Sequence, residues 1–360
     1  MKSTNLTGKG PGAREHYDVL HAERSLPEDD RDASLRPQNL QEFLGQAALK
    51  ENLSIFIAAA KERKESLDHL FLFGPPGLGK TTLAQVVAHE LGADFKVTSA
   101  PTLDKPKDLA GILTTITDKT VFFIDEIHRL KPAMEEMLYT AMEDYALDCI
   151  IGQGSHIRTI RIPIPAFTLV GATTKAGNVS SPLVSRFGIS CRFSFYEQED
   201  MEAIIRRSAG ILQVSIDPEA ARLLAKASRG TPRVANRLLR RMRDFAQVLG
   251  GPASSITPQV LRQGLTRLEI DPLGLEQYDR EILRTIIERY KGGPVGAETL
   301  AISVGEAVDT LEDYYEPYLI QSGLLQRTPR GRIVTDLAYE HLKIPKPVSQ
   351  DKDEPKGFFF

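Results

Sequence analysis

The chain has 360 residues, of which 41% are hydrophobic and 26% are charged. This length predicts two or three domains, and the composition excludes disordered, collagen-like and disulfide-scaffold chains. The net charge of −3 excludes nucleic-acid binding driven by bulk charge, so any such site must be local. No apolar run is long enough to span a bilayer, and Cys149 and Cys191 lack metal-ligand or redox spacing. We therefore expect a protein of a reducing compartment without a membrane segment.

The first elements are an extension and a helix. Residues 1–33 are polar and show no sustained periodicity, which predicts a flexible N-terminal extension. From Leu40 to Ile57 the apolar residues recur every three or four positions, which predicts a helix packed against another element.

Four short apolar runs follow, separated by helical stretches, at 70–73, 120–124, 167–170 and 191–195. Such runs are typical of buried parallel strands in an α/β layer architecture. We therefore predict one α/β domain over residues 34–197. Within it, segment 146–166 resembles two strands around Gly152 and Gly154, which predicts a hairpin.

The remainder of the chain has a different pattern. Residues 198–268 are helical in pattern and predict a small helical domain. Residues 269–345 show three short helical patterns and then strand, tight turn and strand, which together predict a winged helix. The tail, 346–360, is rich in Pro, Lys and Asp and ends in three phenylalanines, and we expect it to be disordered.

A phosphate-binding loop is predicted directly after the first apolar run. Residues Gly74 to Thr81 read GPPGLGKT, a full P-loop pattern followed by an apolar-periodic helix. The glycines let successive N–H groups point at phosphate oxygens, and the helix N-terminus adds partial positive charge. Lys80 is expected to reach the β- and γ-phosphates of ATP, and the Thr81 hydroxyl is expected to bind Mg²⁺.

Further candidates for hydrolysis follow the later strands. Asp125 and Glu126 follow an apolar run at the end of a predicted strand. There Asp125 can bind Mg²⁺ through water, and Glu126 can orient or deprotonate the attacking water. The alternative is that both are ordinary solvated residues at a strand end. Thr174 can bond the γ-phosphate or the water, or simply cap a turn. Arg186 and Arg233 lie next to helix breaks and can neutralise the negative charge that develops in the transition state of phosphoryl transfer. The alternative is that they are solvated surface residues, as most exposed arginines are.

The motifs GPPGLGKTT, DEIH, GATT, SRFG and GTPR occur in the order and spacing of the AAA+ ATPases, which this chain resembles. The segment 35–37 and the block from Tyr315 to Arg332 are more specific, and they resemble the RuvB family of bacterial branch-migration motors. The resemblance covers about residues 34–345. It implies a P-loop AAA+ core with a parallel sheet flanked by helices, a helical small domain and a C-terminal winged helix.

The resemblance also implies residue roles. Thr174 would be the first sensor, Arg186 an arginine finger acting on a neighbouring subunit's ATP, and Arg233 the second sensor. The nucleotide-binding set that it implies is Leu35, Arg36, Gly74, Gly77, Gly79, Lys80, Thr81, Thr82, Glu143, Asp144, Tyr145, Arg186, Tyr196 and Arg233.

Arginines cluster at the predicted wing. Arg327, Arg330 and Arg332 lie around the turn between its two strands. Guanidinium groups can grip backbone phosphates without reading bases, which suits a motor that passes any sequence. The alternatives are a winged helix that binds a protein partner and arginines that are merely solvated.

The function implied is that of a cytoplasmic ATP hydrolase whose hexameric rings pump duplex DNA and drive branch migration of Holliday junctions in recombination and repair. The implied partners are RuvA, docked on the 146–166 hairpin, and the resolvase RuvC. A replication-initiator or loader protein is the first alternative, because such proteins can also end in a winged helix. A protein-remodelling ring is the second, but the chain shows no aromatic pore-loop signature that we recognise.

Overall fold

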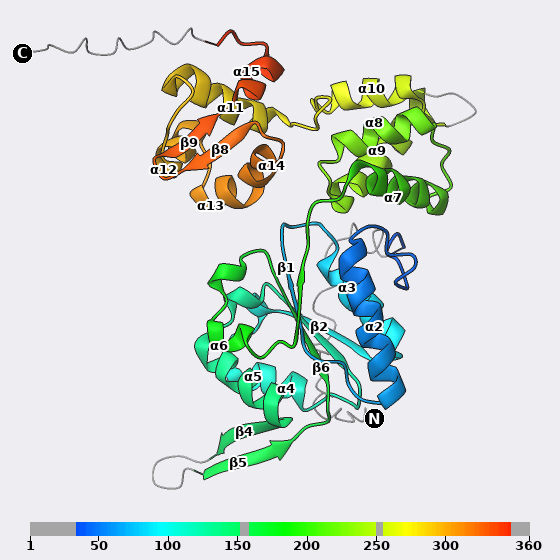
Figure 1. Cartoon of the computed structure of the whole chain (residues 1–360), viewed down its shortest axis with the longest axis vertical. Coiled ribbons are helices and arrows are strands. Elements are labelled where there is room, and N and C mark those ends of the chain that lie inside the picture. Colours follow the sequence, from blue (N-terminus) through cyan, green and yellow to red (C-terminus); the bar gives the residue numbers. More distant parts are fainter. Residues whose placement is uncertain (1–33, 152–157, 250–254, 347–360) are drawn as a thin grey trace, which may run out of the picture. The chain divides into compact units, whose positions relative to one another are not determined.

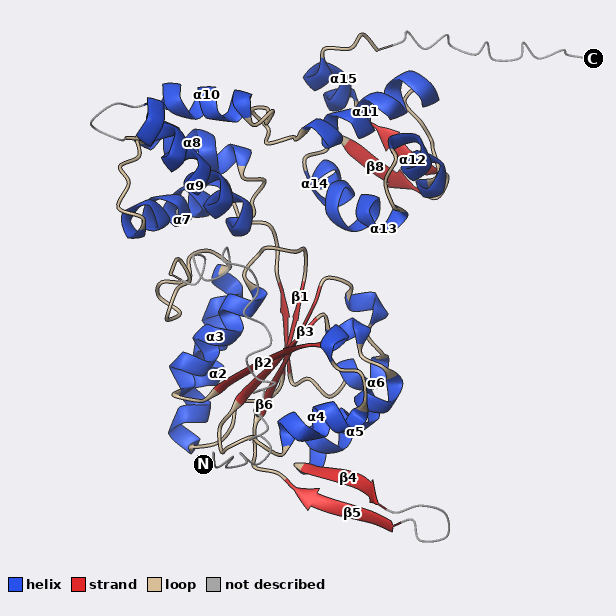
Figure 2. Ribbon diagram, turned by 180° about the vertical axis from the view of Figure 1, so that it is seen from behind, coloured by secondary structure: helices blue, strands red, loops and turns tan. Residues whose placement is uncertain are grey.

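The computed structural model describes residues 34–151, 158–249 and 255–346 (Figures 1 and 2). The predicted extension 1–33, the turn glycines Gly152 and Gly154 and the tail after residue 346 lie outside the described residues. By its contacts the chain divides into two units, 1–36 and 37–360. In the described residues no helix combines the length and apolar character needed to cross a membrane.

A five-stranded parallel sheet forms the centre of the first domain. Its strands are β1 (Leu70–Phe73), β2 (Phe95–Ser99), β3 (Val121–Asp125), β6 (Thr168–Thr173) and β7 (Ile189–Arg192). They lie in the order β2-β3-β6-β1-β7, and all adjacent pairs are parallel. The predicted α/β layers are thus confirmed. Strand β2 was not predicted, because it is a partly exposed edge strand that carries Lys96 and exposes Val97 and so shows no apolar run.

Helices cover both faces of the sheet (Figure 1). On one face lie α2 (Ala47–Arg63) and α3 (Lys80–Leu91), and on the other α4 (Pro106–Leu113), α5 (Pro132–Asp144) and the short α6 (Ser181–Val184). Each face has its own apolar core. The helix predicted from Leu40 begins only at Ala47, because Gly45 and Gln46 adopt left-handed conformations that end the preceding turns.

The hairpin in segment 146–166 is confirmed. Strands β4 (Ala146–Ile151) and β5 (Arg158–Pro163) pair antiparallel, with Ala146 opposite Pro163. In Figure 1 the pair extends from the end of α5 and does not join the central sheet.

Four helices follow the sheet, as the pattern from 198 onward predicted. They are α7 (Gln198–Ile211), α8 (Pro218–Ala227), α9 (Pro232–Leu249) and α10 (Pro258–Arg267). Each places apolar residues on one face, and these residues are buried together, so the amphipathic pattern explains the bundle.

The last described part is a winged helix with its own core. Its helices are α11 (Gln277–Tyr290), α12 (Ala297–Val304), α13 (Val308–Thr310), the π-turn Leu311–Tyr315, α14 (Glu316–Gln321) and α15 (Asp336–Leu342). Strands β8 (Leu325–Thr328) and β9 (Gly331–Val334) form the predicted antiparallel wing, with Arg327 opposite Arg332.

Candidate nucleotide site and wing

The carboxyl ends of three neighbouring strands meet at one edge of the sheet. Strand β6 lies between β3 and β1, so the residues that follow these strands are brought close together. The P-loop begins at Gly74 after β1, Glu126 follows β3, and Thr174 follows β6. Ligands of open α/β sheets bind outside the carboxyl ends of strands. The topology therefore gathers three of the candidate elements at one edge.

The P-loop has the backbone that only glycine accepts. Gly74, Gly77 and Gly79 have φ values of 143°, 76° and 98°. A Cβ on Gly74 would lie 2.5 Å from the carbonyl oxygen of Phe193, and one on Gly77 would lie 2.8 Å from a methyl of Thr231. The loop is therefore closely packed as well as left-handed, and α3 begins at Lys80 with its first N–H groups pointing toward the loop.

Lys80 is buried within this loop. Its ammonium donates hydrogen bonds of 2.9 Å to the carbonyl oxygens of Gly74 and Pro75. Burial lowers the pKa of Lys80 to about 8, while Asp125 and Glu126 act to raise it. The Lys80 ammonium group, held among the loop carbonyls, is in position to bind the phosphates of a nucleotide.

The acidic end of β3 is tied to the end of β6 through a histidine. The backbone N–H of Glu126 donates to the carboxylate of Asp125 at 2.9 Å. His128 places Nε2 3.4 Å from the Glu126 carboxylate and Nδ1 2.8 Å from the hydroxyl of Thr173. His128 and Thr173 were not predicted as site residues, although they lie in the DEIH and GATT motifs. Thr174 itself is half-buried directly after β6.

Arg233 and Tyr196 pack against the P-loop. The backbone N–H of Arg233 donates to the carbonyl of Gly77 at 3.3 Å, at the first turn of α9. The buried Tyr196 hydroxyl donates to the carbonyl of Leu78 at 3.0 Å. The backbone N–H of Tyr196 in turn donates to the carbonyl of Gly230. The loop before α9 thus contacts the phosphate-binding loop directly.

Arg186 lies in a different environment. Its guanidinium pairs with the carboxylate of Glu143 at 3.1 Å and donates to the carbonyl of Pro182 at 2.7 Å. It also stacks over the ring of Tyr139, 4.3 Å from the centroid. The structure therefore joins Arg186 to the end of α5, where Glu143 of the predicted set is found.

The other members of the predicted nucleotide-binding set lie as follows. Asp144 pairs with Arg161 of the hairpin, and Tyr145 ends α5 in a left-handed conformation. Leu35 and Arg36 belong to the separate unit 1–36, so their membership of the nucleotide-binding set stays a prediction. Thr81 and Thr82 lie in the first turn of α3 and are half-buried.

The donor set fits a magnesium ion that is shared with phosphate. In the parts of the chain that the structure describes, no group of three or more His, Cys, Asp and Glu side chains could hold a metal alone. Mg²⁺ commonly takes only one or two protein oxygens and completes its shell with phosphate oxygens and water. Thr81 at the start of α3 and Asp125 at the end of β3 can supply those oxygens.

The three wing arginines are not equivalent. Arg327 is exposed and pairs with Glu312 at 2.9 Å, and Arg330 is exposed in the turn. Arg332 is 6% exposed, and its guanidinium is held by Glu312 and by Glu316, the latter at 2.6 Å. In this position Arg332 cannot make the expected contact with a DNA phosphate. Arg327 and Arg330 are the two wing arginines whose side chains are exposed to solvent.

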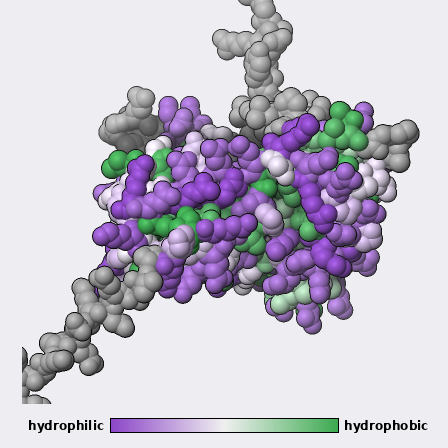
Figure 3. Space-filling view, turned by 90° about the horizontal axis from the view of Figure 1, so that it is seen from above, coloured by the Kyte–Doolittle hydropathy of each residue, from purple (hydrophilic) through white to green (hydrophobic). Residues whose placement is uncertain are grey.

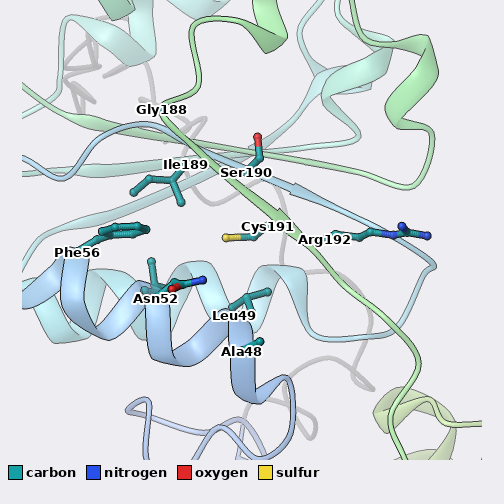
Figure 4. A pocket seen from close by; sticks show the side chains of 10 residues that line it. Ala48, Leu49, Asn52, Phe56, Gly188, Ile189, Ser190, Cys191 and Arg192 are labelled. Carbon is teal, nitrogen blue, oxygen red and sulfur yellow. The ribbon is translucent and has the colours of Figure 1, made fainter.

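A separate cavity of about 420 Å³ lies between α2 and the edge strand β7. Leu49, Asn52 and Phe56 line one side and Ile189 and Cys191 the other (Figure 4). None of the P-loop residues lines it.

The face in Figure 3 is mostly hydrophilic, with small hydrophobic areas between polar side chains.

Comparisons with known proteins agree along the chain. Three family models match: the Holliday junction DNA helicase RuvB P-loop domain over residues 35–193, the RuvB AAA lid domain over 196–271 and the RuvB C-terminal winged helix domain over 272–343. The Holliday junction branch migration complex subunit RuvB of Treponema denticola is 71% identical over 94% of this chain and 98% of the relative. That of Treponema pallidum is 65% identical over 89% and 91%. A solved structure titled as the Thermotoga maritima RuvB Holliday junction branch migration motor has 50% identity and a TM-score of 0.79, covering 87% of this chain and 100% of that chain.

Proposed function

The chain belongs to the RuvB family of Holliday-junction branch-migration ATPases, and from this premise we propose how its residues perform that activity. The protein is a nucleotide-binding motor subunit of the branch-migration complex. The observation that carries the residue-level proposal is the gathering of Lys80, the acidic end of β3 and Arg233 around one P-loop.

ATP is bound with its phosphates on the P-loop. The backbone N–H groups around Gly77 and Gly79 hold the phosphate oxygens, and Lys80 contacts the two terminal phosphates. The Thr81 hydroxyl and the Asp125 carboxylate would hold Mg²⁺. When bound there, the ion would supply positive charge to the β- and γ-phosphate oxygens.

Hydrolysis needs a positioned water and added positive charge. Glu126 orients or deprotonates the attacking water, and Thr174 contacts the γ-phosphate or that water. Arg233 reports the nucleotide to the helical bundle, since its helix begins at the P-loop contact. Arg186 serves as an arginine finger for the ATP of a neighbouring subunit. This role is supported by the position of its guanidinium, which lies at the end of α5 and not among the P-loop contacts.

Duplex DNA is contacted by the wing of the C-terminal domain. Arg327 and Arg330 are exposed at the turn and can reach backbone phosphates. Phosphate contacts carry no sequence information, which suits a motor that moves along any duplex.

The subunits act as a hexameric ring that pumps duplex DNA through RuvA-bound junctions, with RuvC as a further partner. RuvA docks on the hairpin of β4 and β5. This proposal is supported by Ile160, an apolar side chain on β5 that is 46% exposed.

The test is Glu126→Gln, which keeps the shape of the side chain and removes its basicity. We expect ATP and Mg²⁺ binding to be retained while kcat falls roughly 100-fold or more, because general-base catalysis is lost. ATP turnover is measured with and without duplex and four-way junction DNA, and junction dissociation is measured with RuvA present.

Two outcomes would contradict the proposal. Unchanged hydrolysis in Glu126→Gln would remove Glu126 as the water-activating residue. Turnover stimulated by DNA without dissociation of junctions in the wild-type protein would favour a loader function.

A further inference from the structure

We propose that His128 is a positioning residue for ATP hydrolysis, which orients the Glu126 carboxylate and ties it to the strand that leads to Thr174. The inference rests on the proposed role of Glu126 in activating water. His128 follows Glu126 by two residues, in the short 3-10 turn Ile127–Arg129. Its side chain is 9% exposed, whereas that of Glu126 is 37% exposed.

The contacts of His128 form a chain across the edge of the sheet. Nε2 lies 3.4 Å from the Glu126 carboxylate, and Nδ1 lies 2.8 Å from the Thr173 hydroxyl. The backbone N–H of Lys175 donates to the same hydroxyl oxygen at 2.9 Å. The chain thus runs from the segment after β6, through Thr173 and His128, to the residue after β3.

The direction of each hydrogen bond follows from its partners. The Thr173 oxygen accepts from the Lys175 N–H, and its own proton can then be donated to Nδ1. A neutral ring that accepts at Nδ1 carries its proton on Nε2, and this nitrogen lies 3.4 Å from the Glu126 carboxylate, which only accepts. Burial lowers the pKa of His128, against the opposing effect of Glu126, so the neutral ring is the form present at neutral pH.

Such a chain of contacts would hold the Glu126 carboxylate in position to contact the attacking water. A glutamate side chain that is more than a third exposed has several rotamers, and only some of them place its oxygens near a bound γ-phosphate. Hydrolysis requires hydrogen-bond geometry, and a displacement of about 1 Å can lower a rate roughly 100-fold. Thr173 is the last residue of β6 and Thr174 the next residue, so one chain of contacts links Glu126 to the proposed γ-phosphate contact.

The first experiment separates the hydroxyl from the shape of Thr173. Thr173→Val has nearly the same volume and lacks the hydroxyl, so His128 loses the donor that fixes its tautomer. We expect kcat for ATP in the full-length ring on duplex DNA to fall roughly 10-fold or more, with KM unchanged. Thr173→Ser keeps the hydroxyl and should recover most of kcat. Equal losses in the Val and Ser variants would overturn the hydrogen-bond chain.

The second experiment tests whether His128 acts through Glu126. His128→Ala should lower kcat as Thr173→Val does, and His128→Gln, which keeps an N–H donor near the place of Nε2, should recover part of it. In the Glu126→Gln background, His128→Ala should cause no further loss of single-turnover hydrolysis. A further loss of the full size would show that His128 acts independently, for example as its own base, and would overturn the inference.

The two proposals fail separately. If Glu126→Gln hydrolyses ATP normally, the proposed role of Glu126 fails. If Glu126→Gln is slow while His128→Ala and Thr173→Val match the wild type, only the role of His128 fails. Thermal unfolding of each variant shows whether a loss of kcat comes from a loss of fold.

Discussion

Lys80 shows how burial controls a single charge at this site. Its side chain is 8% exposed, and this burial lowers the pKa to about 8, while Asp125 and Glu126 act to raise it and Arg233 acts to lower it. Bound phosphates favour the charged form of a lysine and raise its pKa. Binding of ATP and protonation of Lys80 are therefore linked, and the affinity for ATP must fall where the free protein loses this proton.

The first prediction concerns this pH dependence. The Kd of Mg²⁺-ATP should rise roughly 10-fold between pH 7 and pH 9, because the charged fraction of a group with a pKa of about 8 falls by that factor. Titration with a fluorescent ATP analogue measures it. Lys80→Arg, which stays charged, should lose the pH dependence whatever its affinity, and Lys80→Ala should lose ATP binding and turnover together. A wild-type Kd that is constant over this range would contradict the prediction.

At the scale of the element, the wing depends on one buried ion pair. Arg332 on β9 holds Glu316, the first residue of α14 and 1% exposed, at 2.6 Å. A buried carboxylate that loses its cation is left uncompensated, which typically costs about 3 to 5 kcal/mol. Arg332 thus fastens the wing to α14, whereas Arg330, in the turn before β9, is exposed.

The second prediction compares these two arginines. Arg332→Ala should lower the unfolding temperature of the protein, or of the winged-helix domain if that domain unfolds separately. The reason is that the buried carboxylate of Glu316 has then lost its cationic partner. Arg330→Ala should leave unfolding unchanged. It should weaken binding equally to two unrelated duplexes and reduce the salt-dependence slope by about one, as expected for one lost phosphate contact. A loss confined to one sequence would instead indicate base reading, and an unchanged affinity would exclude Arg330 as a DNA contact.

At the scale of the whole molecule, the proposed role of Arg186 requires a neighbouring subunit. The third prediction is that Arg186→Ala retains ATP binding, because its proposed target lies on a neighbouring subunit. Hydrolysis should fall roughly 1,000-fold or more if Arg186 acts as arginine fingers do elsewhere. Mixing this variant with Lys80→Ala subunits should restore part of the turnover, since some interfaces then pair an intact P-loop with an intact Arg186. Mixed rings that form without any recovery would argue against action between subunits.

Much of the fold could be predicted because its signals are local. The apolar runs that became β1 and β3 were found within one residue, since strands buried on both faces are apolar throughout. The run at 167–170 located the start of β6, which continues three residues further to Thr173. Strand β2 could not be found in this way, because one edge of it is open and Val97 is exposed. The start of α2 was misplaced by several residues, because left-handed Gly45 and Gln46 carry no periodic signal.

By itself the sequence determined the P-loop motif and predicted the chemistry of the nucleotide site. A P-loop, an acidic strand end and a threonine strand end are contiguous motifs whose backbone geometry is built locally. Only the tertiary structure decided which side chains meet across elements, because hydrogen-bond partners far apart in the chain leave no spacing pattern. It was the tertiary structure that placed His128 between Glu126 and Thr173, and that assigned Arg332 to Glu316 inside the wing while leaving Arg330 exposed.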